Sequence, residues 1–193
     1  MREPREYVTR WRERSDSLRR VSIDGTDTGR SSVRVTIDDD SASVDTGVPV
    51  LDHLLSLLAR YAHFGLSLEV EPGSADAEVA AAGTAFGEAL AEPLRAEGAR
   101  GYGAASMTAS EALAQVVLEA SDEPLVVSNV DLSEARLGGL ASDLVARFLQ
   151  RLAEGAGLTL HVRLVNGSDT QHVLEAIFKA LGVALCQACS TSR

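Results

Sequence analysis

The sequence predicts an α+β fold of two tandem half-domains related by a pseudo-twofold axis, each a β-sheet with two helices packed on one face. The first observation is a repeated strand pattern, from Gly65 and again from Gly157, a spacing of 92 residues. The second is that a Gly-Ser loop and an apolar helical run follow each copy. The third is a further helical run before each copy, so that a helix–strand–loop–helix unit occurs twice.

Alternating apolar residues predict strands in both halves, and apolar residues at helical spacing predict helices. In the first half we expect strands at 33–37, 44–47 and 66–70 and helices at 51–61 and 79–94. In the second half we expect strands at 116–118, 125–127 and 158–164 and helices at 140–156 and 173–185. The chain then divides into an arginine-rich arm at 1–20, a first half-domain at 21–98 and a second at 99–193.

The arm at 1–20 interleaves arginines with acidic residues, and Tyr7, Val8 and Trp11 lie at helical spacing. This pattern predicts either an amphipathic helix that docks on the body or on a neighbouring subunit, or a solvated helical arm.

The composition and charge of the chain argue against some classes of partner. A net charge of −10 argues against a nucleic-acid partner, because binding to phosphates needs a basic surface. No apolar run approaches the ~20 residues that span a bilayer, and the N-terminus has no apolar signal core. We therefore expect a cytoplasmic protein without a membrane partner. Cys186 and Cys189 have C-x-x-C spacing, but without a second cysteine pair we interpret them as small helix residues.

The chain has four histidines, and three of them, His53, His161 and His172, lie at informative places. His172 and Glu175 are three residues apart on a predicted helix and therefore share a face. A histidine and a carboxylate on one helical turn, with a third ligand from a strand, is a pattern that holds a divalent metal. A simple His–Glu pair is the alternative. His63 at the end of the first helix is interpreted as structural.

Three segments resemble imidazoleglycerol-phosphate dehydratase: TGVPVLDHLL at 46–55, TLHV at 159–162 and GSDTQHVLEAIFK at 167–179. The resemblance extends over nearly the whole chain, from about residue 20 to about residue 188. It implies that family's fold, with half-domains like domain 2 of ribosomal protein S5. It also implies a manganese enzyme of histidine biosynthesis, built as a large symmetric assembly with sites between subunits.

The metal ligands that the resemblance implies are only partly present. His53 and His161 match, and the second helix motif keeps His172 and Glu175, with Gln171 in place of its first histidine.

The first helix motif has lost most of its donor atoms. Asp76, Ala77 and Ala80 stand where the family has two histidines and a glutamate, and alanine cannot ligate a metal. In the family's phosphate pocket, Glu123 replaces an arginine and so reverses its charge, whereas Glu111 keeps the glutamate of an Asp-Glu pair. We therefore expect neither a two-metal centre nor a phosphorylated substrate.

The sequence thus predicts a divergent enzyme of dehydratase ancestry, a lyase, cyclase or isomerase, outside histidine biosynthesis. It would perform an elimination, isomerisation or cyclisation on a non-phosphorylated, apolar small molecule. The expected catalytic residues are His53, His172, Glu175 and Glu111, and the expected substrate-binding residues are Asp52, Asp76, Ala77, Ala80, Gln171 and Lys179.

Three alternatives stay open. The main expectation is that the protein has no cofactor. The first alternative is a single divalent metal, manganese, iron or zinc, held by His161, His172, Glu175 and Asp76. The second is a non-catalytic binding or structural homologue, and the third is an authentic imidazoleglycerol-phosphate dehydratase. In the family, metals help to join trimers into the large cage. Because metal ligands are missing here, we expect a homo-oligomer that is a trimer and not the large cage.

Overall fold

The computed structural model describes residues 22–24, 31–37, 41–130, 136–137 and 140–191, so the predicted arm at 1–20 lies outside it. The first half contains β1 (Ser22–Asp24), β2 (Ser31–Ile37), β3 (Ala42–Asp45), α2 (Pro49–Ala62), β4 (Phe64–Val70) and α3 (Ala75–Arg95). The second half contains β5 (Tyr102–Ala109), β6 (Ala112–Ala120), β7 (Leu125–Ser128), β8 (Arg136–Leu137), β9 (Leu140–Ala141), α4 (Ser142–Ala156), β10 (Leu158–Asn166) and α5 (Thr170–Cys189).

Each half forms a four-stranded sheet of the same topology. The strand order is β1-β2-β4-β3 in the first sheet and β5-β6-β10-β7 in the second. In both sheets, the strand after the first helix of its half lies between two earlier strands, antiparallel to β2 or β6 and parallel to β3 or β7. The predicted internal duplication is therefore confirmed. The strands β5 and β1 and the short pair β8–β9 were not predicted.

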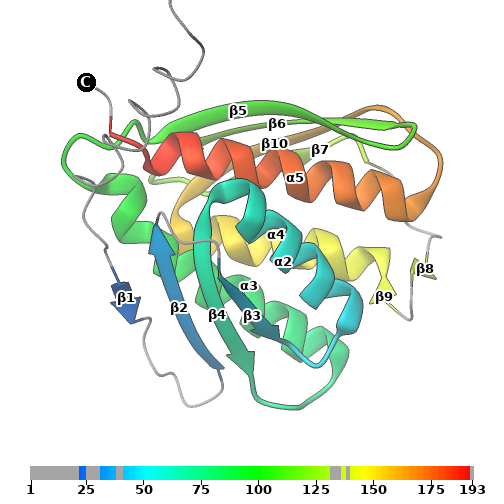
Figure 1. The fold of residues 1–193 in the computed structure, drawn as a ribbon, viewed down its shortest axis with the longest axis horizontal. Coiled ribbons are helices and arrows are strands. Elements are labelled where there is room, and N and C mark those ends of the chain that lie inside the picture. The colour runs from blue at the N-terminus through cyan, green and yellow to red at the C-terminus, as the bar shows by residue number, and fades with distance from the viewer. Residues whose placement is uncertain (1–21, 25–30, 38–40, 131–135, 138–139, 192–193) are drawn as a thin grey trace, which may run out of the picture.

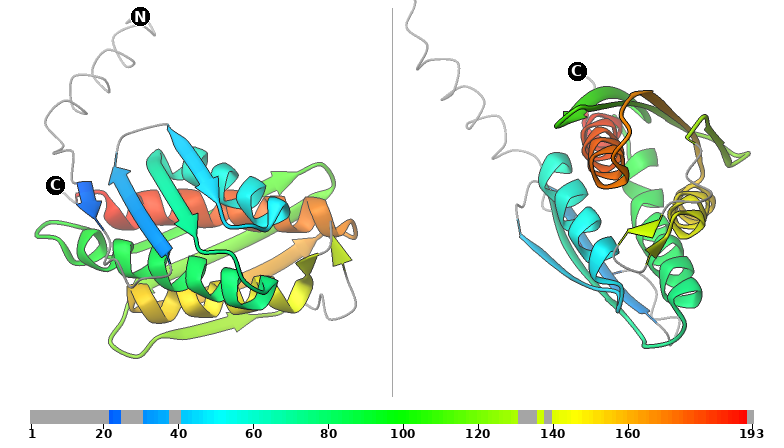
Figure 2. Two further views of the ribbon diagram at one scale, coloured as in Figure 1. Left: turned by 90° about the horizontal axis from the view of Figure 1, so that it is seen from below. Right: turned by 90° about the vertical axis from the view of Figure 1, so that its right-hand side faces the viewer.

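The helices form the middle of a sandwich between the two sheets (Figure 2). The helices α2 and α3 pack on the first sheet, α4 and α5 pack on the second, and α3 lies against α4 while α2 lies against α5. Figure 1 shows α5 running along the second sheet, with α2 beside it. The predicted arrangement, two helices on one face of each sheet, is confirmed.

The true spacing of the repeat is 94 or 95 residues, and the predicted spacing of 92 is wrong by two or three. The residue after α2 is His63 (φ 54°) and the residue after α4 is Gly157 (φ 64°), a spacing of 94. The side chains of Ser74 and Asp169 cap the N-termini of α3 and α5, a spacing of 95. A slip of two residues keeps every strand residue on its own face, so alternation alone cannot detect it.

Two glycines at equivalent positions let the helices of the two halves approach closely. A Cβ atom added at Gly87 of α3 would lie 2.5 Å from the carbonyl oxygen of Leu152 in α4. A Cβ atom added at Gly182 of α5 would lie 2.5 Å from the carbonyl oxygen of Leu58 in α2. These contacts set the distance between the halves and therefore the position of every side chain between α2 and α5.

The C-terminal end of α4 is completed by an arginine of the other half. The guanidinium of Arg95, at the end of α3, donates to the carbonyl oxygens of Ala156 (2.8 Å), Gly157 (3.2 Å) and Ser121 (3.1 Å). The last carbonyls of a helix have no partner within it, so this side chain satisfies groups that α4 cannot.

The helix α5 is long and apolar enough, by length and composition alone, to cross a membrane, which the sequence analysis did not anticipate. Its apolar window is 61% buried inside the fold, as expected of a core helix. Near its end, burial raises the pKa of the Cys189 thiol to about 12, with a smaller contribution from Cys186. A thiol held protonated in this way is a poor nucleophile, consistent with Cys189 as a packing residue.

We expect Gly87→Ala and Gly182→Ala each to destabilise the fold by about 1–3 kcal/mol, because the added methyl group must push two helix backbones apart. Thermal or denaturant unfolding measures the effect. The matched control is Gly73→Ala, where the nearest atom to an added Cβ is 3.9 Å away. Equal stability of all three variants would contradict the close approach of the helices.

Candidate active site

The N-terminal end of α5 meets the turn between β5 and β6, and this contact creates the main polar cluster. Asp169 caps the helix by accepting from the backbone N–H of His172 (3.1 Å). The imidazole Nδ1 of His172 then lies 2.6 Å from Oε2 of Glu111, which comes from the turn. Two expected catalytic residues from distant parts of the chain are therefore brought into direct contact.

The carboxylate of Glu111 is held by several donors. Its Oε1 accepts from the backbone N–H of Asp169 (3.1 Å) and, more weakly, of Ser168 (3.5 Å). The backbone N–H of Asp169 first, then that of Glu111 itself, and less strongly the contacts to His172 and Ser168, lower the pKa of Glu111 from the ordinary 4.5 to about 2. At neutral pH the group is therefore an ionised acceptor and not a proton donor.

A second pair lies beside the first, where α2 packs against α5. Nε2 of His53 is 3.6 Å from Oε1 of Glu175, and the same oxygen accepts from the side-chain amide of Gln171 at 3.0 Å. The side chain of Glu175 is 19% exposed, whereas that of His53 is 61% exposed. The arrangement presents an accessible imidazole backed by a largely covered carboxylate.

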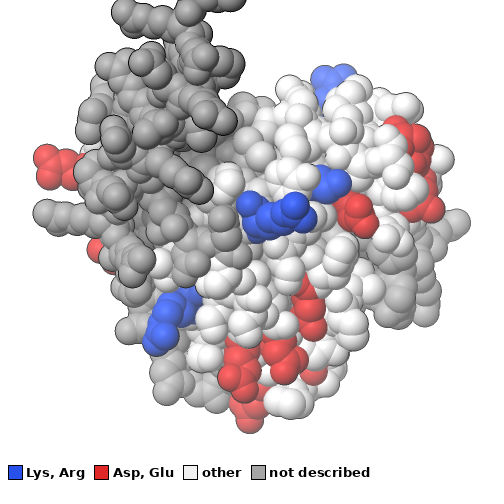
Figure 3. Space-filling view, viewed as in Figure 1, with Lys and Arg blue, Asp and Glu red and all other residues white. Residues whose placement is uncertain are grey.

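Lys179 adds a cation two turns further along α5. Its ammonium group donates to the carbonyl oxygen of Thr108 (3.4 Å) and lies 5.9 Å from the centre of the Tyr61 ring. Figure 3 shows acidic side chains gathered at the end of the molecule where α5 begins, with basic side chains nearer its middle.

Asp52, expected to bind substrate, has its carboxylate engaged within the fold. Its Oδ1 accepts from both the backbone N–H (2.8 Å) and the hydroxyl (2.6 Å) of the fully buried Thr46. This fixes the loop that leads into α2, and so fixes the start of the helix that carries His53.

Asp76 lies in a different place, between α3 and α4. Its carboxylate makes a two-pronged ion pair with the guanidinium of Arg147, at 3.0 and 3.1 Å. The neighbouring Ala77 is exposed and Ala80 is half-buried. The structure therefore does not bring these three expected substrate-binding residues together with the cluster around His172.

The pseudo-twofold axis relates the two places. At the spacings of 94 and 95 residues, Arg147 corresponds to His53, and Asp76, Ala77 and Ala80 correspond to Gln171, His172 and Glu175. One inter-half contact carries histidines and a glutamate, and the other carries a salt bridge and two alanines. Arg147 was not among the predicted site residues, and only the corrected spacing aligns it with His53.

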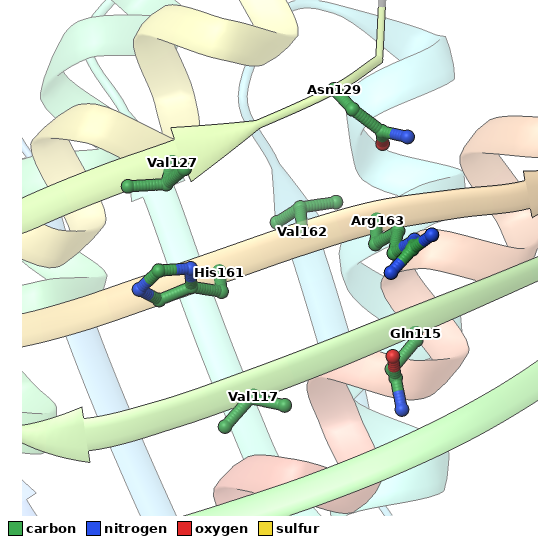
Figure 4. Close-up of a pocket in the computed structure, with 7 residues that line it drawn as sticks. All are labelled: Gln115, Val117, Val127, Asn129, His161, Val162 and Arg163. Carbon is green, nitrogen blue, oxygen red and sulfur yellow. The ribbon is translucent and has the colours of Figure 1, made fainter.

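His161 lies on the outer face of the second sheet, away from α5 (Figure 4). Val117 and Val127 flank it on the neighbouring strands, and Gln115, Asn129 and Arg163 line the same depression, of about 680 Å³. Its neighbours along β10, Leu160 and Val162, are buried on the opposite face. The candidate ligands His161 and His172 of one chain thus belong to different surfaces.

The described residues of a single chain contain no group of three or more His, Cys, Asp or Glu side chains able to hold a metal. At the first helix motif, Ala77 and Ala80 offer no donor atom and Asp76 already pairs with Arg147. These residues do not fit one half of a two-metal centre.

Comparison with known proteins places this geometry in a family. The family model for imidazoleglycerol-phosphate dehydratase matches residues 46–185. The chain belongs to the imidazoleglycerol-phosphate dehydratase family. It is 42% identical over 160 residues to the dehydratase of Syntrophobacter fumaroxidans, covering 80% of this chain and 81% of the relative. It is 37% identical over 155 residues to that of Bacillus cereus, covering 78% and 80%.

Solved structures of the family match as well. The Staphylococcus aureus dehydratase has a TM-score of 0.81 at 28% identity, covering 88% of this chain and 99% of that one. The Pyrococcus furiosus enzyme, in complex with (S)-C348, has a TM-score of 0.77 at 29% identity, covering 87% and 94%. The predicted family and fold are confirmed. The expectation of an enzyme of lyase ancestry holds at the level of the family, whose named relatives are imidazoleglycerol-phosphate dehydratases.

We expect Glu111→Gln to reduce stability most above pH 4.5 and progressively less as the pH falls toward 2. The folded-state pKa of about 2 lies below the ordinary 4.5, so ionised Glu111 stabilises the fold fully above 4.5. That contribution disappears as the pH falls through about 2. Unfolding of wild type and variant in parallel from pH 7 to pH 2 measures it. A stability difference that does not change with pH would contradict the assignment.

Proposed function

We propose that this protein is an acid–base catalyst of the imidazoleglycerol-phosphate dehydratase family that acts on a substrate other than imidazoleglycerol phosphate. The observation that carries the proposal is the contrast between two equivalent places. His172 contacts Glu111 and His53 faces Glu175 at one, whereas Ala77 stands at the other, beside the Asp76–Arg147 ion pair.

The two histidines suit an elimination. His172 takes a proton from carbon through its ring nitrogen that does not face Glu111, and the C–H electron pair forms the new double bond. The protonated form of His53, which lies 3.6 Å from Glu175, gives its proton to the leaving hydroxyl, which departs as water when the C–O bond breaks. Both protons are accounted for, and no step passes through a metal. Isomerisation uses the same two groups, with the second proton returned to carbon.

The side chains at the two equivalent places suggest the kind of substrate. Lys179 and Gln171 supply hydrogen-bond donors on the helix of His172, whereas Ala77 and Ala80, at the equivalent place between α3 and α4, offer methyl groups where polar ligands would be needed. We infer a non-phosphorylated, largely apolar small molecule in a pathway outside histidine biosynthesis, such as secondary metabolism. A cytoplasmic location and the absence of a nucleic-acid or membrane partner belong to the same proposal.

Dehydration of imidazoleglycerol phosphate is the second candidate, and the relatives support it better than the first. Identity of 42% over 80% of the chain to a named dehydratase is the specific observation in its favour, although the sequence analysis ranked it last. A non-catalytic binding homologue, or a single metal held by His161, His172, Glu175 and Asp76 of different chains, is a further outcome of the experiments below.

We expect the purified chain to show no turnover of imidazoleglycerol phosphate with Mn²⁺, no growth rescue of a histidine auxotroph, and no stabilisation by Mn²⁺ in thermal unfolding. The Syntrophobacter fumaroxidans relative assayed in parallel is the positive control. The variant Asp76→His/Ala77→His/Ala80→Glu restores donor atoms, so Mn²⁺ should raise its unfolding temperature but not that of wild type. Turnover or growth rescue by wild type would establish the second candidate, and stoichiometric metal in protein purified without chelator would establish the single-metal site.

We also propose a homo-oligomer, a trimer in preference to the larger cage, joined through the outer face of the second sheet. That face exposes Tyr102, Val117, Leu125 and Val127 by 42–56% of their surface. The described part of the first sheet's outer face is polar instead, with Ser43, Ser67 and Glu69 exposed. Exposed apolar patches mark interaction surfaces.

We expect Val117→Glu to convert the trimer to monomers, because the substitution places unpaired charge in a buried interface. Light scattering coupled to size exclusion measures the mass, with and without Mn²⁺. The matched control, Ser67→Glu on the outer face of the first sheet, should leave the trimer intact. A trimer that persists in Val117→Glu would place the interface elsewhere, and a full cage without metal would contradict the assembly state.

A further inference from the structure

Glu111 does two separable things at the start of α5. One carboxylate oxygen accepts from the backbone N–H groups of Asp169 and Ser168, and the other faces Nδ1 of His172 at 2.6 Å. The first oxygen holds the loop that leads into α5, and the second oxygen contacts the imidazole of His172. The duplication of the chain allows the two to be told apart.

In the part of the first half that the structure describes, the same loop is held by a carboxylate of the following helix. The backbone N–H of Gly73, which corresponds to that of Ser168 at the spacing of 95, donates to Oε1 of Glu78 at 2.7 Å. Glu78 belongs to α3 itself and is 8% exposed. The residue at the position of His172 is Ala77, so no imidazole is present there. The loop of the first half is thus held by Glu78 with no imidazole beside it, whereas in the second half Glu111 contacts both the loop and the imidazole.

The turn that presents Glu111 is strained. Its other residue, Ser110, has φ 49°, a conformation that favours glycine, and the turn joins Ala109 to its strand partner Ala112. Non-glycine residues persist in this region when the surroundings determine them, often at functional sites. Here the strained turn aims Glu111 at the N-terminal end of α5.

We propose that Glu111 is a positioning residue that fixes His172 in the Nδ1–H tautomer and leaves Nε2 as its proton-accepting atom. An ionised carboxylate has no proton to give, so the nitrogen that faces it carries the hydrogen and the other nitrogen carries the lone pair. Glu111 is thus distinguished from the acid–base groups among which the sequence analysis counted it. Only the use of Nε2 in catalysis rests on the proposed function; the tautomer does not.

A second carboxylate near Nδ1 provides the matched control. Asp169 Oδ1 lies 3.8 Å from the same nitrogen, outside hydrogen-bond range, while it caps the helix. The substitution Asp169→Ser removes this carboxylate and keeps a good capping group. If Glu111 sets the tautomer, His172 should be unaffected by this change.

The test is nitrogen-15 NMR of the histidine side chains in the resting full-length protein, at alkaline pH where imidazoles are neutral. The chain has four histidines, and the signals absent from His172→Gln assign that residue. We expect the Nδ1–H pattern in wild type and in Asp169→Ser, and a shift to mostly Nε2–H, the form free histidine prefers in water, in Glu111→Ala.

An Nε2–H pattern in wild type would overturn the proposal whether or not Glu111→Ala folds. So would an unchanged pattern in folded Glu111→Ala, or loss of the Nδ1–H pattern in Asp169→Ser. Because no substrate or metal is added, these outcomes are independent of the turnover and growth assays that test the proposed function.

Discussion

The close approach of α2 to α5 at Gly182 is the constraint on which the site depends. A side chain at this position would meet the backbone of α2 and push the two helices apart. His53 on α2 would then move away from Glu175 on α5. Both helices are otherwise held by apolar packing against their own sheets, which sets orientation but not this distance. The glycine therefore acts on the chemistry through geometry, although it touches none of the polar groups.

The duplicated contact between α3 and α4 keeps the same backbone arrangement and has different side chains. Gly87 takes the place of Gly182, and the ion pair of Arg147 with Asp76 takes the place of the His53–Glu175 pair. A fold can keep its packing while one of two equivalent surfaces changes chemistry, because the packing residues and the surface residues lie on different faces of each helix. In this chain the chemistry of each surface is thus set separately from the packing.

The sequence was sufficient for the fold class, the duplication and the helices, because these follow from apolar periodicity. It was not sufficient for the contact between Glu111 and His172, which joins a strained turn to a helix end about sixty residues later in the chain. The repeat spacing predicted from the sequence was also wrong, because strand alternation does not change when the alignment shifts by two residues. The equivalence of Arg147 and His53 was therefore not predicted. The strand β5 was missed because its small residues, such as Ala104 and Ser106, give a weak apolar signal.

Arg95 of the first half donates to the carbonyl oxygens that end α4 in the second half, so the second half depends on the first. A gene fragment encoding the second half alone would leave that helix end without its guanidinium, and its glycine-lined surface without a cover. The two halves share one topology, yet the first supplies groups that complete the second. Splitting the chain between them should succeed only where both pieces are produced together.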